Sequence, residues 1–172
     1  MILPTFDMFY AAPMSLFGTA VAGLYGLITG SFLNVVIYRL PEMERRRDAN
    51  DRAMNMRLAE PYPEKFNLSV PRSACPNCAR KLTIIENIPV LSFIGLLGRC
   101  WGCKTPISLR YPIIELMTAA VTAGIIWVIG TNWNALWTLA YFYTMVVVFG
   151  MVFDAIVAQR TKNKSNGKAK AG

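Results

Sequence analysis

The sequence predicts an all-α membrane protein with about three transmembrane helices and a small zinc-ribbon-like four-cysteine domain between the first and second helix. Hydrophobic residues make up 54% of the chain and the mean hydropathy is +0.36, which is too apolar for an ordinary soluble domain. Long apolar runs alternate with polar segments. All four cysteines lie in one of these polar segments, as two C-x-x-C pairs.

The first apolar run covers residues 8–40 and is expected to form the first transmembrane helix. At about 1.5 Å per residue, its length is sufficient to cross a hydrocarbon core of roughly 30 Å. Because proline cannot continue the helical hydrogen-bond pattern, we expect Pro41 to help end this helix. Small residues at every fourth position would let another helix approach closely. They are Gly18, Ala22, Gly26 and Gly30.

Residues 41–111 are expected to form a cytoplasmic loop that carries the metal domain at 72–111. The charged first part of this loop has the composition of a solvated surface insertion. Its helix-forming residues also allow a short helix from about Glu42 to Glu60, before two prolines.

The two C-x-x-C pairs predict a metal site. Each pair suits a tight turn that aims two sulfurs at one point, and two such turns complete a tetrahedral shell. Zinc is the expected occupant, in a structural role, because four protein ligands leave no open position for a reacting water. Two disulfides, four free thiols and thiol redox chemistry are the alternatives. The ligands would be Cys75, Cys78, Cys100 and Cys103, with Arg80, Lys81, Arg99 and Lys104 as nearby positive charges.

Two further apolar runs, at 112–130 and 135–158, are expected to form the second and third transmembrane helices. Glu115 lies one turn inside the second helix, where a carboxylate gains from the helix dipole and could pair with Arg39 or Arg110. Glu115 is therefore either a functional residue or a helix-capping anchor at the membrane interface.

Charge placement predicts the orientation. All 18 lysines and arginines lie between Arg39 and Arg110 or from Arg160 onward, and positive charge beside membrane spans marks the cytoplasmic side. The four-cysteine domain and the basic tail at 159–172, which we expect to be disordered, would then be cytoplasmic, in a reducing compartment that favours metal over disulfides. A basic segment between membrane spans indicates a membrane partner and no nucleic acid. The absence of histidine excludes histidine-based acid-base catalysis.

Four sequence segments stand out when they are taken in order. The segments are GSFLNVVIYRLP at 30–41, CPNC at 75–78, ENIPVLSFIGLLGRCWGC at 86–103 and RYPIIE at 110–115. Together they resemble the N-terminal half of the type IV prepilin leader peptidase/N-methyltransferase family, the bifunctional membrane enzymes of pilus and type II secretion systems. The resemblance covers about residues 15–155.

This resemblance implies a multi-pass protein of the bacterial inner membrane that matures prepilins or pseudopilins. It implies an aspartic peptidase that removes the leader, and a methyltransferase that uses S-adenosylmethionine on the new N-terminus. In the family, the glycine before the second cysteine pair is associated with methylation; it is Gly98 here, and Glu86 belongs to the same signature. Asp154 matches the first catalytic aspartate.

The second aspartate of the family, in a glycine-aspartate motif, has no counterpart among these residues. One carboxylate cannot both accept and donate the protons of peptide hydrolysis, so we expect that this chain alone does not cleave prepilin. Asp154 could instead pair with Arg160 at the interface. No G-x-G-x-x-G segment marks a methyl-donor site, so methylation depends on the resemblance alone.

Two functional hypotheses follow. The chain is a shortened enzyme that retains methylation or works with a separate chain carrying the second aspartate, whose helices could dock on the small-residue positions of the first span. Alternatively, it is a non-catalytic membrane adaptor that binds prepilins through its zinc domain.

Overall fold

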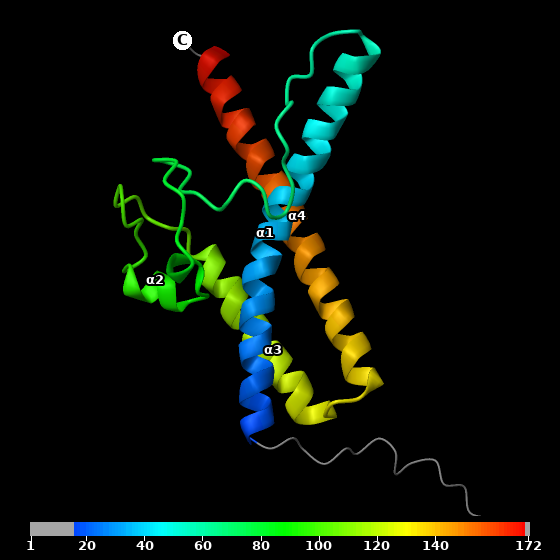
Figure 1. Cartoon of the computed structure of the whole chain (residues 1–172), viewed down its shortest axis with the longest axis vertical. Coiled ribbons are helices and arrows are strands. Elements are labelled where there is room, and N and C mark those ends of the chain that lie inside the picture. Colours follow the sequence, from blue (N-terminus) through cyan, green and yellow to red (C-terminus); the bar gives the residue numbers. More distant parts are fainter. Residues whose placement is uncertain (1–15, 171–172) are drawn as a thin grey trace, which may run out of the picture.

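The computed structural model describes residues 16–170, and these residues form an all-α architecture (Figure 1). In the described residues, three helices each contain an apolar stretch long enough to cross a membrane. The predicted fold class, three membrane helices with a four-cysteine domain after the first, is confirmed. The expected start of the first span at residue 8 lies outside the described residues. The elements are α1 (Leu16–Asn55), the 3-10 helix η1 (Ile85–Asn87), α2 (Leu91–Gly95), α3 (Arg110–Ile129) and α4 (Trp133–Lys170).

The three long helices pack around a small apolar core. α3 and α4 form a hairpin whose turn lies near the start of α1, and the later parts of α1 and α4 diverge at the other end (Figure 1). The core consists of Leu33 and Ile37 from α1 with Val146 from α4, and Ile114 of α3 packs against it. Only 6% of the apolar window of α4 is buried, against 28% for α1 and for α3. α4 therefore presents most of its surface to its surroundings.

The close helix approach predicted from the small residues of α1 occurs against α3. Gly26 and Gly30 are buried, and a Cβ atom at Gly30 would lie 2.0 Å from the Oγ1 atom of Thr118. A Cβ atom at Gly26 would lie 2.6 Å from the Oγ1 atom of Thr122. These two positions are filled by a helix of the same chain, so they are not free to receive a helix from a separate protein.

Substituting Gly30 is expected to separate α1 from α3. Gly30→Ala places a methyl group where the Thr118 hydroxyl lies, and such overpacking costs about 1–3 kcal/mol. Gly124→Ala is the matched control, because Gly124 lies on α3 with open space around its Cβ position. Thermal denaturation in detergent should show a lower midpoint for Gly30→Ala only. Equal midpoints would contradict the close packing of α1 on α3.

The expectation that the first helix ends at Pro41 is wrong. α1 continues through Pro41 to Asn55, so the expected helix after Glu42 is its extension. Proline removes one helical hydrogen bond, but adding residues to an existing helix is easier than starting a new one. Glu42 supports the extension by pairing with Arg45 at 2.7 Å and with Arg46 at 2.8 Å. The hydrogen bond from Arg45, the largest cause, lowers the pKa of Glu42 to about 2, so the carboxylate stays charged.

The segment after α1 folds back onto that helix, and most of its residues are exposed, as expected for a solvated surface insertion. Buried Arg39 donates from Nη1 to the carbonyl of Asn67 at 2.8 Å and from Nη2 to the carbonyl of Pro71 at 2.7 Å. The side chain of Asn50 exchanges two hydrogen bonds with the backbone of Tyr62, at 2.9 and 3.0 Å. Arg39 therefore fixes the start of the cysteine lobe, defined as residues 72–109, against α1.

The end of α4 also differs from expectation. Its start is capped by Asn132, whose Oδ1 atom accepts the N–H of Ala135 at 2.9 Å. The helix then continues past residue 158 to Lys170, so residues 159–170 are helical where disorder was expected. The residues there include alanine, lysine and glutamine, which are good helix formers, and the established helix before them removes the cost of nucleation.

Candidate metal centre and the groups tied to it

The four cysteine sulfurs converge on one point. Their Sγ atoms all lie within 4.8 Å of one another, and those of Cys75 and Cys103 are 3.7 Å apart. All four thiols are free, whereas a disulfide would hold two sulfurs about 2.05 Å apart. Thiolates about 2.3 Å from a tetrahedral metal ion are about 3.8 Å from each other, so the spacing fits a zinc-type ion. The predicted four-cysteine cluster is confirmed, and it is compatible with a metal site.

The two C-x-x-C pairs form two copies of one backbone turn. In the first copy, residues 73–82, the Cys75 N–H donates to the carbonyl of Arg80 at 3.0 Å. In the second, residues 98–107, the Cys100 N–H donates to the carbonyl of Thr105 at 2.9 Å. The residue after each pair, Ala79 or Lys104, has a positive φ of 56° or 59°. Each turn also contains one isolated bridge, Ala74 with Lys81 in the first and Arg99 with Pro106 in the second.

The surroundings of the sulfurs favour partial ionisation. The Thr105 hydroxyl lies 3.2 Å from the Cys103 Sγ atom and, with Asn77, lowers the pKa of Cys103 to about 5. Backbone N–H groups of Cys103 and Gly102 lower the pKa of Cys100. The Arg80 backbone N–H lowers the pKa of Cys78, but desolvation and the neighbouring sulfurs raise it to about 11. A cluster that holds some thiolates and resists the last one is suited to a cation at its centre.

Glu86 holds η1 to the first cysteine turn. It forms an ion pair with Arg80, and its Oε2 atom accepts the backbone N–H of Thr83 at 2.8 Å and the Thr83 hydroxyl at 2.9 Å. The Thr83 backbone N–H is the main cause of the lowered pKa of Glu86. Arg80, expected to stabilise the thiolates, forms its ion pair with Glu86 and also interacts with Cys100. Lys104 lies over the Trp101 ring at 5.2 Å.

Gly98 connects α2 to the second cysteine turn. It has a positive φ of 66°, a conformation that favours glycine, and its N–H donates to the carbonyl of Phe93 at 2.8 Å. A Cβ atom at this position would lie 2.8 Å from the Cζ atom of Phe93. Both the conformation and the space at residue 98 therefore favour glycine.

Glu115 ties the cysteine lobe to α3. Its buried Oε2 atom accepts the backbone N–H of Val90, the residue before α2, at 2.8 Å. The expected pairing with Arg39 or Arg110 does not form, because those guanidinium groups bind the 67–71 segment and Asp154. Val90 also has a positive φ of 57° at this point of the chain.

Removing the Glu115 carboxylate is expected to free α2. Glu115→Ala leaves the Val90 N–H without its acceptor, a loss worth about 1–3 kcal/mol, whereas Glu115→Gln keeps an acceptor oxygen in place. Hydrogen exchange of the amides from Val90 to Gly95 should become faster in the alanine variant and stay nearly unchanged in the glutamine variant. Unchanged exchange in both variants would contradict the anchoring role of Glu115.

Asp154 joins α4 to the start of α3. It forms an ion pair with Arg110 and not with Arg160, the partner expected at the interface. Residues six apart on a helix do not share a face, so the spacing itself could have excluded Arg160. Glu86 and Gly98 thus lie inside the cysteine lobe, and Glu115 contacts it from α3. Asp154 contacts Arg110, the residue that follows the lobe.

Comparison with known proteins identifies the family. The family model described as the Bacterial Peptidase A24 N-terminal domain matches residues 24–129. This chain belongs to the prepilin leader peptidase/N-methyltransferase family. It is 44% identical over 136 residues to the prepilin leader peptidase/N-methyltransferase of Aeromonas hydrophila. The aligned region covers 78% of this chain and 47% of that protein. The corresponding protein of Neisseria gonorrhoeae is 40% identical over 125 residues, covering 72% of this chain and 44% of that protein.

The chain spans less than half of the length of the prepilin leader peptidase/N-methyltransferases it matches. The part matched by the family model contains all four cysteines, Glu86, Gly98 and Glu115, and it ends before Asp154. No solved structure matches this chain.

Proposed function

We propose that this chain acts in the maturation of prepilins or pseudopilins, as the metal-binding membrane part of a prepilin leader peptidase/N-methyltransferase. One observation carries the proposal. The four-cysteine cluster is tied through α2 and Glu115 to the first turns of a membrane span, inside the region that the family model matches. A metal at the cluster would fix the lobe beside the membrane, where a prepilin enters and leaves.

Zinc is the metal that we propose, bound by the four thiolates. When bound, it would supply folding energy and no reactive water, because all four positions of its shell come from protein. Zinc bound in equimolar amount, with all four thiols protected from alkylation, would support this role. It would also exclude the redox alternative, which needs a reactive cysteine pair.

The proposed orientation places the cysteine lobe on the cytoplasmic side of the inner membrane. Its support is the charge pattern: Arg39, Arg110 and Arg160 border the spans on one side, and the turn between α3 and α4 carries no charge. A cysteine-reactive or reporter tag in the lobe should report a cytoplasmic location in cells.

Leader cleavage needs two carboxylates, one to activate water and one to protonate the departing amine. Asp154 is the residue in this sequence that matches the first aspartate of the family. The other aspartates are Asp7, outside the described residues, and Asp48 and Asp51, on the extension of α1. We therefore propose that none of these three residues is the second carboxylate. Methylation with S-adenosylmethionine remains a proposal from the family alone.

Replacing Asp154 tests the peptidase role. In cells that carry a prepilin and a partner protein with a glycine-aspartate motif, Asp154→Asn should abolish leader removal, by a factor of at least about 10³ if the residue shares the proton transfers. Asp48→Asn is the matched control, because Asp48 is exposed on α1 and is not part of the ion pair between Arg110 and Asp154. Leader removal that persists in Asp154→Asn would refute the catalytic role.

A second candidate function is a non-catalytic membrane adaptor for prepilins. The ion pair between Arg110 and Asp154 favours it, because that pair gives Asp154 a structural role. Mass spectrometry of mature pilin from a deletion strain separates the two functions. Unchanged cleavage and methylation together with failed pilus assembly would support the adaptor, and loss of either modification would support the enzyme.

A further inference from the structure

The segment 84–97, which contains η1 and α2, exposes large apolar side chains that the described part of the chain does not cover. Glu86 is its one charged residue. A run of exposed apolar side chains this dense indicates an interaction surface. The exposed fractions are 80% for Ile84, 73% for Ile85, 65% for Leu91, 62% for Ile94 and 85% for Leu97.

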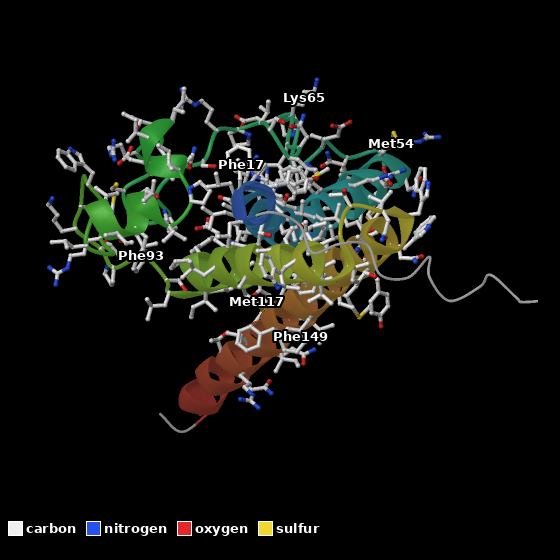
Figure 2. The ribbon with its side chains drawn as sticks, turned by 90° about the horizontal axis from the view of Figure 1, so that it is seen from below. Phe17, Met54, Lys65, Phe93, Met117 and Phe149 are labelled. Atoms are coloured by element: carbon white, nitrogen blue, oxygen red, sulfur yellow. The ribbon has the colours of Figure 1, made fainter. Side chains whose placement is uncertain are left out.

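This apolar segment lies at the edge of the membrane-spanning region. The hydrogen bond from the Val90 N–H to Glu115 ties the start of α2 to the first turns of α3, a membrane span that begins at Arg110. α2 lies beside those first turns and runs across the direction of α1 (Figure 1). In the view from below, α2 lies beside α1 and α3, and no long helix lies in front of it (Figure 2). The apolar side chains therefore lie close to the end at which the α3 span begins.

The border of this apolar segment suits a phospholipid surface. Lysines and arginines flank it in sequence, and basic side chains near a membrane are attracted to anionic headgroups. Trp101 is 65% exposed beside Lys104, and tryptophan prefers the membrane–water interface. Besides Arg80 and Arg110, which form ion pairs with Glu86 and Asp154, the flanking cations are Lys81, Arg99 and Lys104.

We propose that residues 84–97 insert into the membrane surface as a short interfacial anchor. The side chains of Leu91, Ile94 and Leu97 would lie among the acyl chains, and the flanking cations would contact phosphate groups. The anchor and Glu115 would together hold the cysteine lobe at a fixed height next to α3. This inference does not depend on the proposed enzymatic function.

Photo-crosslinking tests which partner covers the segment. The full-length chain, with benzoylphenylalanine at residue 94 or 97, is irradiated in nanodiscs of phosphatidylethanolamine and phosphatidylglycerol, and adducts are weighed by mass spectrometry. The matched control carries the probe at Leu58, which is equally exposed at 64% but follows the far end of α1. Phospholipid adducts at 94 and 97 should exceed those at 58 several-fold.

Crosslinking with the same probe in living cells shows whether a protein covers the segment instead of lipid. If residues 94 and 97 crosslink to protein, and form no more lipid adducts than residue 58, the face is a protein docking site and the lipid anchor is overturned.

A variant with Leu91→Asn, Ile94→Asn and Leu97→Asn provides a second measurement. In nanodiscs it should show faster amide exchange over 84–97, with its thiols still protected from alkylation. Exchange equal to that of the unaltered chain would also overturn the anchor.

Discussion

Removing the metal from this protein is expected to unfold the cysteine lobe while the three membrane helices stay folded. In the described residues the lobe has two helices, one of them a single 3-10 turn, two isolated bridges and few buried apolar side chains. A core of that size hardly compensates for the chain entropy of ordering the lobe, and the metal that we propose at the four cysteines would supply the difference. Structural zinc sites contribute about 10–16 kcal/mol of apparent binding energy at neutral pH, which becomes folding energy.

The experiment compares hydrogen exchange of the purified chain before and after treatment with a chelator. Amides from residue 73 to 107 should lose protection, while those in α3 and in the membrane part of α1 should keep theirs. Cys75→Ser should reproduce the loss, because Cys75 is buried in the cluster. Added zinc should restore protection to the chelated protein and not to the variant. A lobe that keeps its protection without metal would contradict a structural ion.

The spans and the sulfur cluster were predictable because each depends on a short-range pattern. A run of apolar residues long enough to cross the hydrocarbon must be helical, since lipid offers no partner for backbone groups. Two C-x-x-C pairs specify two sulfur-directing turns wherever the chain brings them together. Neither prediction requires knowledge of which helices touch.

The failed predictions concern contacts that depend on the tertiary arrangement. Glu115 was expected to pair with a guanidinium group, but it accepts the backbone N–H of Val90, which is 25 residues away in the sequence. Pro41 was expected to end the first helix because proline breaks helices locally. The salt bridges of Glu42 and the docked 62–71 segment instead support the helix beyond Pro41. Sequence gives no register between distant segments, so these partners could not be assigned from it.

Substituting Gly98 is expected to damage the cysteine lobe and, through it, any activity that the lobe supports. Gly98→Val must adopt a positive φ, which costs a side chain about 1–2 kcal/mol, and overpacking against the Phe93 ring costs about 1–3 kcal/mol more. The lobe should show faster amide exchange over α2 and lower zinc retention, and prepilin methylation in cells should fall together with them.

Gly95→Ala is the matched control, since Gly95 lies in α2 of the same lobe with open space around its Cβ position, and alanine suits a helix better than glycine. It should leave zinc retention and methylation unchanged. Adding Phe93→Leu to Gly98→Val should restore part of the lost protection, because the ring atoms that meet the new side chain are then absent. If Gly98→Val abolishes methylation while zinc retention and exchange over α2 stay native, the glycine acts directly at a methyl-donor site. Parallel losses of all three would instead assign the family's methylation-associated glycine to the geometry of the turn that joins α2 to Cys100.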